Sequence, residues 1–269
     1  MTLPIGLQLY TVRDALAQDF ERSLKQVAKF GYEYVEWAGL YGRTAAQVRT
    51  LADKLGLKSS SAHAGLEAFT TGLDQTIADA RTLGYTLLVC PWLDGKYHNP
   101  EGFKHVAKVL TEAGKKAADH GMKVCYHNHA FEFNKLADGS IGMDILYGES
   151  DPRFVWAELD LYWVWHGGQC PNAWLQKLAG RTPLVHVKDM AKLPDRRMIE
   201  VGHGILDMAT YLRTAEATGT QFLVVEQDGY WVDNDPLLSA KISYKNLGKI
   251  LAGKKVSQPK VQAAAVVGP

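Results

Sequence analysis

Length, composition and charge narrow the class of protein to which this chain can belong. It has 269 residues, of which 46% are hydrophobic and 22% are charged, so it can bury a large core. The 30 basic and 29 acidic residues nearly cancel, and no basic stripe or polybasic run predicts a nucleic-acid or membrane partner. No apolar stretch approaches the roughly 20 residues of a membrane-spanning helix. We expect a cytoplasmic protein, because no signal-peptide pattern precedes LPIGLQLY and the three cysteines form no CxxC pair.

Eight predicted strands alternate with eight predicted helices along the chain. The strands are expected at 5–10, 33–38, 58–63, 86–91, 122–128, 154–160, 183–188 and 222–227. The helices are expected at 19–30, 44–55, 72–83, 99–119, 141–148, 171–179, 206–218 and 236–252. A glycine just past a helical stretch, as at Gly31, recurs before five of the strands and is typical of a helix end.

This alternation predicts the fold class. Strands that alternate with helices form parallel sheets, and eight such units in about 250 residues close a barrel. We therefore predict an α/β fold, a single (β/α)8 TIM barrel over residues 1–253. Residues 254–269 lack a core pattern and are expected to form a tail, either a mobile end or an arm that packs on a neighbouring molecule.

Four short apolar runs in the second half of the chain each end in residues that can ligate a metal ion. The runs are KVCYHNHAFEF, FVWAELDLYW, PLVHVKDM and FLVVEQDGY. The last three offer Asp160, His186 and Glu226, which meet if the strands end at one rim of a barrel. A strand-end aspartate alone more often caps the next helix, and a lone histidine is more often a core residue. Together the three suit one divalent cation, with Mn²⁺ preferred and Co²⁺, Mg²⁺, Zn²⁺ or Fe²⁺ as alternatives.

The end of the fifth predicted strand leaves two candidates for a further ligand. Period-two alternation places Cys125, His127 and His129 on one face, and Glu132 lies in the following loop, from which it can fold back. We favour Glu132 over His127, because a third carboxylate better neutralises a hard divalent ion. His127 or His129 then serves as a proton-transfer group near neutral pH, although a polar rim of hydrogen-bonding residues is the alternative interpretation.

Other residues near strand ends are candidates for catalysis or substrate binding. Glu226 is predicted both as a metal ligand and as a base, and Lys188, two residues after His186, is placed to neutralise oxyanion charge. Aromatic faces stack on the C–H surfaces of sugars, although some strand-end aromatics must belong to the core. The candidate substrate-binding residues are His63, Trp37, Trp92, His203 and Trp163.

Several motifs resemble those of the sugar phosphate isomerase/epimerase group, the xylose isomerase-like TIM barrels. They are GLQLYTVRD, YVEWAGLYG, SSSAHAG, YHNHAFEF, LDLYWVWHGG, HVKDM, VGHGILD and VVEQD, spread over nearly the whole barrel. The resemblance implies one divalent metal bound by residues of strands five to eight, and Asp160, His186 and Glu226 match the family's Asp, His and last Glu. It also implies an α-hydroxyketone substrate that chelates the metal through neighbouring oxygens.

The resemblance thus predicts a metal-dependent sugar isomerase or epimerase that works through a metal-stabilised enediolate. One departure concerns the fifth strand, which ends in Glu in the ketose 3-epimerases but in His127 here, with Glu132 five residues later. The HNHxxEF arrangement is more similar to inosose dehydratases and other relatives that act on keto-inositols and 3-keto-glycosides. A lyase or dehydratase acting by β-elimination is therefore the alternative, and a non-catalytic sugar-binding barrel or a DNA-repair endonuclease is more distant. A small sugar is the predicted partner; which sugar, whether it is phosphorylated and whether a homo-oligomer forms are left open.

Overall fold

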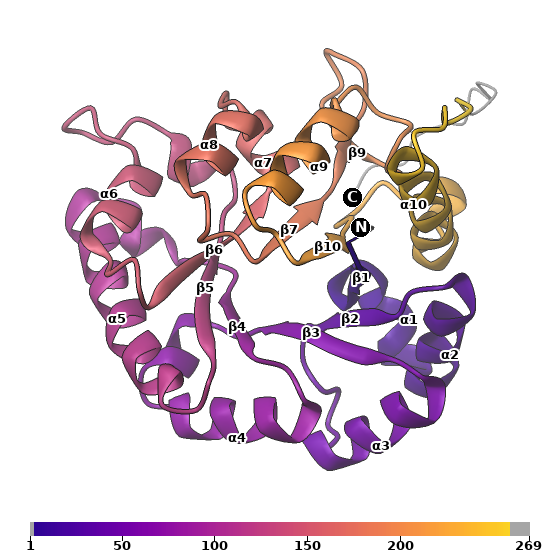
Figure 1. The fold of residues 1–269 in the computed structure, drawn as a ribbon, viewed down its shortest axis with the longest axis horizontal. Coiled ribbons are helices and arrows are strands. Elements are labelled where there is room, and N and C mark those ends of the chain that lie inside the picture. The colour runs from indigo at the N-terminus through magenta and orange to yellow at the C-terminus, as the bar shows by residue number, and fades with distance from the viewer. Residues whose placement is uncertain (1–2, 259–269) are drawn as a thin grey trace.

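The computed structural model describes residues 3–258 and contains a closed barrel of eight parallel strands. The strands are β1 (Ile5–Gln8), β2 (Tyr34–Trp37), β3 (Lys58–His63), β4 (Leu87–Cys90), β5 (Lys123–His127), β6 (Val155–Asp160), β7 (Leu184–Val187) and β10 (Phe222–Val225). Each pairs in parallel with the next along the chain, and β10 pairs with β1 to close the barrel. Helices surround these strands on the outside (Figure 1). The predicted (β/α)8 barrel is confirmed, and every predicted strand overlaps an observed one.

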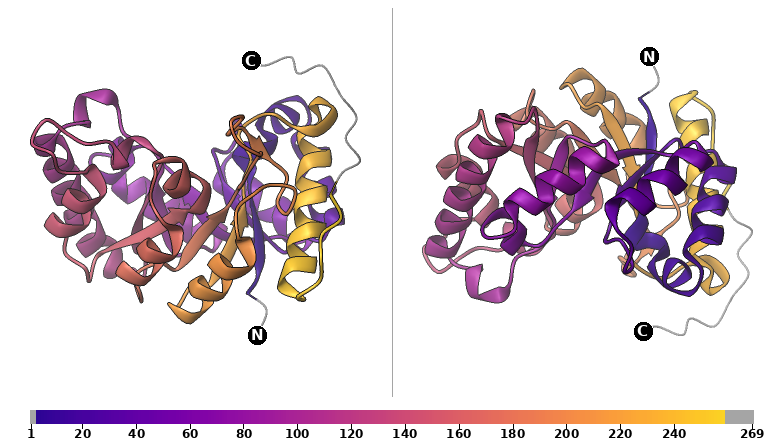
Figure 2. Two further views of the ribbon diagram at one scale, coloured as in Figure 1. Left: turned by 90° about the horizontal axis from the view of Figure 1, so that it is seen from above. Right: turned by 90° about the horizontal axis from the view of Figure 1, so that it is seen from below.

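The predicted helices are also present, with ends that differ by at most two residues. They are α2 (Phe20–Phe30), α3 (Ala45–Leu55), α4 (Leu73–Leu83), α5 (Pro100–Ala118), α6 (Gly142–Glu149), α8 (Pro171–Lys177), α9 (Met208–Ala217) and α10 (Pro236–Leu251). The last of them, α10, packs against α2, so that the late and early parts of the described chain lie side by side (Figure 2). There the Tyr32 hydroxyl donates a hydrogen bond of 2.8 Å to the carbonyl oxygen of Ala240. Among residues 3–258, no helix is long and apolar enough to cross a membrane.

Short elements that the sequence did not predict follow the carboxyl ends of the strands. The α-helices are α1 (Arg13–Gln18) and α7 (Leu161–His166), and an antiparallel pair joins β8 (Asp189–Met190) to β9 (Met198–Ile199). The 3₁₀ helices are η1 (Leu9–Val12), η2 (Leu66–Phe69), η3 (Gly95–Tyr97), η4 (Phe131–Phe133) and η5 (Val232–Asn234). Elements this short carry too few turns for a periodic pattern. Because they come directly after strands, they build the mouth of the barrel.

Side-chain alternation along the strands places polar side chains above a layer of apolar side chains inside the barrel. Inside the barrel, Cys125, Leu184 and Val224 pack together with Leu87 and Val89. Two residues further along the same strands come His127, His186 and Glu226, which share the inward face because the strand repeat is two. The burial of Cys125 confirms that it is a core residue, as does that of Cys90.

Gly31, which ends α2, can be used to test why a glycine so often follows a helix in this chain. Its φ of 106° is left-handed, and a Cβ there would lie 2.6 Å from Cε1 of Tyr244. We expect Gly31→Ala to lower the free energy of unfolding by about 1–3 kcal/mol, measured by urea denaturation. In the matched variant Gly148→Ala, the new Cβ meets no atom within 4 Å and lies in α6, so stability should be unchanged or slightly higher. Equal stability of the two variants would contradict the conformational argument.

The beginning of the predicted tail is described and lies against the loop that contains Gly202. Gln258 donates a hydrogen bond of 3.2 Å from Nε2 to the Gly202 carbonyl oxygen. Residues 259–269 lie outside the described residues, so the boundary at 253 and the nature of the tail stay predictions.

Candidate metal centre

Three of the predicted ligands converge at the carboxyl ends of β6, β7 and β10. These are Asp160, His186 and Glu226, named here the outer group, and all three side chains are buried. Nδ1 of His186 lies 2.8 Å from Oε2 of Glu226 and 4.0 Å from Oδ2 of Asp160. Ligand atoms of the outer group and of His127 all lie within 4.8 Å of one another, which is close enough to surround one cation.

Lys188 places its positively charged ammonium group among the side chains of the outer group. Its Nζ is 3.0 Å from Oδ2 of Asp160, 2.8 Å from Oε2 of Glu226 and 2.9 Å from Oδ2 of Asp228. Burial by itself lowers the pKa of Lys188, but the three carboxylates outweigh burial and raise that pKa well above its usual value. Lys188 and His186 in turn outweigh burial at Glu226 and hold its pKa well below the usual range. Glu226 is therefore an ionised carboxylate.

Asp160 combines two roles that sequence patterns treat as alternatives. Its Oδ1 accepts a hydrogen bond of 2.8 Å from the Trp163 backbone N–H, which caps α7. Its Oδ2 faces Lys188 and His186 and has no hydrogen-bond partner among the described residues. One oxygen thus fixes the carboxylate, and the other is directed into the outer group.

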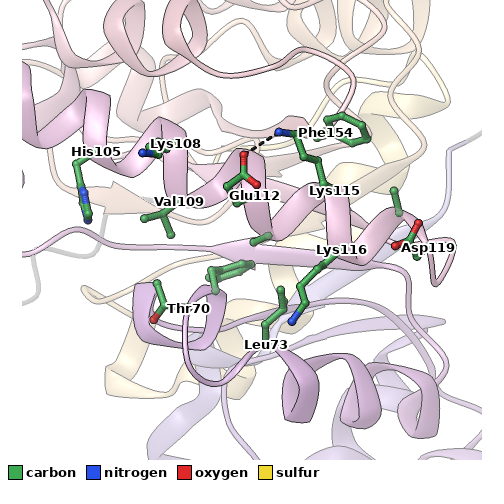
Figure 3. A pocket seen from close by; sticks show the side chains of 13 residues that line it. Thr70, Leu73, His105, Lys108, Val109, Glu112, Lys115, Lys116, Asp119 and Phe154 are labelled. Carbon is green, nitrogen blue, oxygen red and sulfur yellow. Dashed lines mark hydrogen bonds and ion pairs between the residues drawn. The ribbon is translucent and has the colours of Figure 1, made fainter.

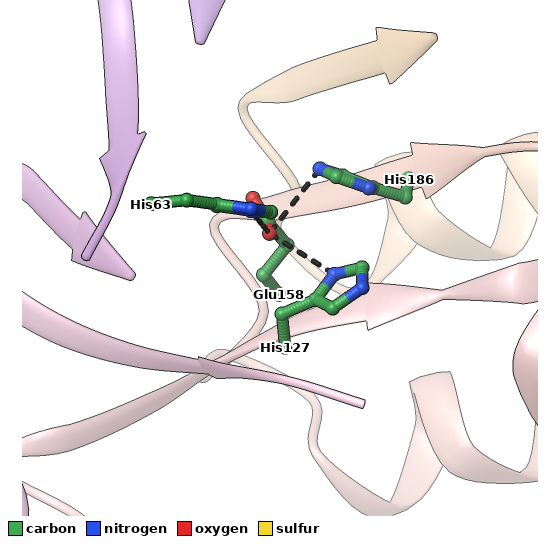
Figure 4. A group of neighbouring side chains, drawn as sticks. All are labelled: His63, His127, Glu158 and His186. Atoms are coloured by element: carbon green, nitrogen blue, oxygen red, sulfur yellow. Dashed lines mark hydrogen bonds and ion pairs between the residues drawn. The ribbon is translucent and has the colours of Figure 1, made fainter. Parts of the chain in front are cut away.

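A second set of ligand-type side chains lies one layer deeper in the barrel. Glu158 precedes Asp160 by two residues on β6 and points to the same face, so its backbone lies about 6–7 Å further down the strand. Oε2 of Glu158 is 2.7 Å from Nε2 of His63 and 3.1 Å from Nδ1 of His127 (Figure 4). Oε2 of Glu36, on β2, is 3.3 Å from Nε2 of His63. We name Glu36, His63, His127 and Glu158 the inner group.

The two groups are linked through the ring of His186. Its Nδ1 faces Glu226 of the outer group, while its Nε2 lies 2.7 Å from Oε2 of Glu36 and 3.2 Å from Oε2 of Glu158. Gln8 on β1 donates a further hydrogen bond of 2.7 Å to the same oxygen of Glu36. Burial lowers the pKa of His63, but the carboxylates of Glu36 and Glu158 outweigh it and raise that pKa to about 10.

The carboxylates of the inner group were missed by the sequence reasoning, although a signal for one was present. In the run AELD, Glu158 and Asp160 stand two apart and must share a face of the strand. Glu36 lies within YVEW, between two apolar residues, and only its facing partners on β3 and β7 show that it belongs to a site.

The fifth strand brings His127, and not Glu132, to the cation ligands. Cys125 and His127 face the barrel interior, as predicted. Glu132 instead accepts hydrogen bonds from the Tyr126 hydroxyl at 2.7 Å and from the His129 N–H at 2.9 and 3.0 Å. Tyr126 alternates with His127 and points outward, so it holds the carboxylate on the far side of β5. The preference for Glu132 as a metal ligand therefore has no support in this geometry, and burial raises the pKa of Glu132 to about 7.

Aromatic side chains form one wall of the mouth around His129. Its ring centroid lies 5.0 Å from that of Trp92 and 5.4 Å from that of Trp163, and Nζ of Lys188 lies 5.5 Å from the Trp163 ring. Trp92 is 54% exposed, so its face is open to a ligand. Burial, helped by Lys188, lowers the pKa of His129 to about 3, which is below the range expected of a proton-transfer group near neutral pH.

Two predicted substrate-binding residues lie in packed regions instead. Trp37 is buried in the core between barrel and helices, with Nε1 donating a hydrogen bond of 2.8 Å to Oγ of Ser59. It points outward because its neighbour Glu36 points inward. His203 lies beside Glu200, whose Oε1 accepts a hydrogen bond from the Ser239 hydroxyl of α10. The predicted sugar contacts of Trp37 and His203 therefore have no support in the structure.

A groove of about 730 Å³ on the outer wall is separate from both ligand groups. It runs along α5 towards Phe154, which precedes β6, and Thr70 and Leu73 line its opposite side (Figure 3). An ion pair of 2.7 Å joins Glu112 to Lys115 at its edge. Neither ligand group uses a residue of this groove, so the chemistry of the chain concentrates at the barrel mouth.

The chain is similar to several known proteins. An inosose dehydratase from Clostridium beijerinckii is 35% identical over 101 residues, which are 37% of this chain and 33% of that protein. The chain thus matches about a third of the length of such curated relatives. A solved sugar phosphate isomerase/epimerase from Parabacteroides distasonis shares the fold, with 24% identity, a TM-score of 0.79, and coverage of 92% of this chain and 94% of that one. The IOLI protein, solved with a bound zinc atom, also shares the fold, with 14% identity, a TM-score of 0.74, and coverage of 93% and 99%.

The match that decides the family extends over most of the barrel. Residues 24–245 fit the sequence model of the xylose isomerase-like TIM barrel family. This range begins in α2 and ends in α10, and it includes every residue of the outer and inner groups. The chain belongs to the xylose isomerase-like TIM barrel family.

Proposed function

We propose that this protein is a divalent-metal-dependent enzyme that removes the α-proton of a keto-sugar, an α-hydroxyketone. The observation that carries the proposal is the convergence of Asp160, His186 and Glu226 on one point at the barrel mouth. Support for an enzyme comes from the relatives, which are named inosose dehydratase and sugar phosphate isomerase/epimerase. A small sugar is the partner that this chemistry needs, while cytoplasmic localisation and a homo-oligomer stay predictions.

The outer group fits a divalent cation by its donor set. It offers two carboxylates and one imidazole nitrogen in a buried setting, and Oδ2 of Asp160 is directed at Lys188 and His186. Such mixed oxygen and nitrogen ligands suit Mn²⁺ best, with Co²⁺, Mg²⁺, Zn²⁺ and Fe²⁺ as alternatives. A cation held there supplies Lewis-acid polarisation of the substrate carbonyl.

The side chains around this point supply the remaining roles. Glu226 is the base, because its ionised carboxylate accepts the α-proton while Lys188 keeps it charged. Lys188 also offsets negative charge that develops on the substrate oxygen. Trp92, Trp163 and the neutral ring of His129 pack against the sugar and exclude water.

The fifth strand favours β-elimination over epimerisation. An epimerase of this kind uses a second carboxylate on the opposite face of the substrate, but Glu132 is turned towards Tyr126 and His127 takes that position. Burial holds the pKa of His127 well below its usual value, so its neutral ring donates an N–H hydrogen bond to the departing β-oxygen. The electron pair of the broken α-C–H bond forms the new double bond, and the leaving oxygen takes its proton from water. Water or an alcohol leaves, and the α-proton stays on Glu226. Isomerisation or epimerisation is the second candidate, since it shares the first step.

Two matched substitutions test the assignment of the cation ligands. We expect Asp160→Asn to lose the outer cation, because it removes the charge of a ligand, and Glu132→Gln to retain it, because Glu132 faces Tyr126. Affinity for Mn²⁺ should fall for Asp160→Asn by more than the roughly 10–100-fold typical of changes outside the ligand shell. Isothermal titration calorimetry, with Mn²⁺ added to the chelator-stripped proteins, measures the affinity of each variant. A loss of Mn²⁺ affinity confined to Glu132→Gln would contradict this assignment and would instead support Glu132 as a metal ligand.

A substrate panel in deuterated water tests the proposed reaction. The Mn²⁺-loaded protein is incubated with ketohexoses, inososes and 3-keto-glycosides, and proton NMR follows both α-proton exchange and loss of the β-substituent. We expect exchange in at least one class, with elimination from an inosose or a 3-keto-glycoside. A fully loaded protein that exchanges no α-proton across this panel would contradict the function.

A further inference from the structure

The inner group has a geometry that hydrogen bonding alone does not explain. Three imidazole nitrogens surround Oε2 of Glu158, from His63 at 2.7 Å, His127 at 3.1 Å and His186 at 3.2 Å (Figure 4). His63 forms a hydrogen bond with that oxygen, and His127 lies beside it without one. Oε2 of Glu36 adds a second carboxylate oxygen, 3.3 Å from Nε2 of His63.

The spacing of these atoms resembles the shell of a coordinated ion. Zinc-type cations hold nitrogen and carboxylate oxygen at about 2.0–2.2 Å, so neighbouring ligand atoms of a tetrahedral site lie roughly 3.3–3.5 Å apart. His63 lies 2.7 Å from Glu158 and 3.3 Å from Glu36, and His127 lies 3.1 Å from Glu158. The contacts of His127 with Glu158 and of His63 with Glu36 are close to this spacing, whereas His63 and Glu158 would have to move apart to admit a cation.

Buried atoms without partners point to a missing positive ligand. Nδ1 of His127 has no hydrogen-bond partner among the described residues, although the side chain is only 2% exposed and points at Glu158 (Figure 4). Oε1 of Glu36 and Oε1 of Glu158 also lack partners there, and both side chains are fully buried. A buried polar atom left unsatisfied costs about 1–3 kcal/mol, and more when it carries charge. Such a group is stable only if something satisfies it.

The charges of the inner group lead to the same conclusion. Glu36 and Glu158 form ion pairs only with histidines among residues 3–258, while Lys188 contacts the carboxylates of the outer group and Asp228. Without a cation, His63 and His186 pair with these carboxylates, but a histidine that ligates a metal does so as a neutral ring and no longer compensates their charge. Two buried carboxylates then match the charge of one divalent ion.

We propose that His63, His127 and Glu158, with Glu36 beside His63, form a second divalent-cation site, one layer deeper than the outer group. The site takes a cation that accepts mixed nitrogen and oxygen ligands, such as Zn²⁺, Co²⁺ or Mn²⁺. His127 binds through Nδ1 and keeps its proton on Nε2, while His186 uses Nδ1 for the outer cation and donates from Nε2 to Glu36. The inner cation thereby fixes the orientation of one histidine at each site, whichever sugar the protein acts on.

Counting bound Co²⁺ in matched variants tests this proposal. The full chain is stripped with a chelator, and equilibrium dialysis and visible absorption follow its titration with Co²⁺. The wild type should bind two equivalents, and Glu158→Gln should bind one. Asp160→Asn should also bind one, but with a different absorption spectrum because the remaining ion lies in the inner site. Glu200→Gln is the control, since Glu200 is a buried carboxylate outside both groups, and it should bind two.

The outcomes separate the inner site from the proposed function. His63→Gln, at the more exposed edge of the inner group, should also bind one equivalent and serves if Glu158→Gln fails to fold by circular dichroism. If Asp160→Asn keeps two equivalents while the inner variants lose one, the inner site stands and the outer assignment fails. A wild type that binds a single equivalent, or inner variants that both keep two, would overturn the inner site.

Discussion

Replacement of Glu226 by glutamine is expected to lower turnover of a confirmed keto-sugar by about 10²–10⁴-fold, the usual contribution of a general base. Glutamine keeps the shape of the side chain but removes both its charge and its basicity. The carboxylate lies 2.8 Å from both Nζ of Lys188 and Nδ1 of His186, so the variant also weakens the cation site. Turnover and α-proton exchange are measured at a Mn²⁺ concentration that saturates the variant, as checked by metal analysis.

Two further variants serve as a control and as a way to distinguish the roles of Glu226 and His127. Glu112→Gln, on the exposed face of α5, should leave turnover unchanged. His127→Asn should slow elimination more than exchange of the α-proton with solvent, because His127 hydrogen-bonds the leaving oxygen and Glu226 removes the α-proton. If both reactions fall together in His127→Asn, His127 is the base. Full turnover by Glu226→Gln would refute the mechanism.

Replacement of Lys188 by methionine is expected to destabilise the cation-free protein by about 3–5 kcal/mol, the usual cost of removing one partner of a buried ion pair. Without its ammonium group, Asp160, Glu226 and Asp228 remain close together with less positive charge. Added Mn²⁺ should restore part of the loss, because the ion binds the folded state at two of these carboxylates. Urea denaturation with and without Mn²⁺ measures both effects.

A surface lysine provides the matched control for that measurement. Lys177 pairs with Asp144, and both side chains are about half exposed. Its replacement by methionine should change the free energy of unfolding by less than about 1 kcal/mol, and Mn²⁺ should not alter the effect. If Lys188→Met were as stable as Lys177→Met, Lys188 would not be the counterion of the outer group.

The repeating units of the fold could be predicted from the sequence because each carries its own local signals. Asn99 and Pro100 open α5, and Gly31 and Gly84 end helices in the left-handed conformation that glycine adopts readily. Helices such as α7 could not be predicted in this way. This helix spans only Leu161–His166, and Asp160 caps its first turn. A strand-end aspartate by itself does not indicate whether a helix follows it.

The convergence of Asp160, His186 and Glu226 could be predicted because each residue ends its own apolar run at a shared rim. The predicted preference for Glu132 over His127 differs from the observed geometry. Glu132 accepts a hydrogen bond from the Tyr126 hydroxyl on the outward face of β5 and is therefore turned away from the outer group. Glu36 was overlooked because its partners come from distant strands, with His186 lying 150 residues away along the chain. Such contacts depend on barrel closure, which brings β2 opposite β7, and no local pattern encodes them.

The central claim is a cation bound by Asp160, His186 and Glu226, and its most direct test is anomalous diffraction from crystals soaked in Mn²⁺. The account predicts an anomalous peak at the barrel mouth, about 2.0–2.3 Å from the ligand atoms of all three residues. Crystals of Asp160→Asn should lose that peak. A saturated crystal with no anomalous density between these three side chains would contradict the account.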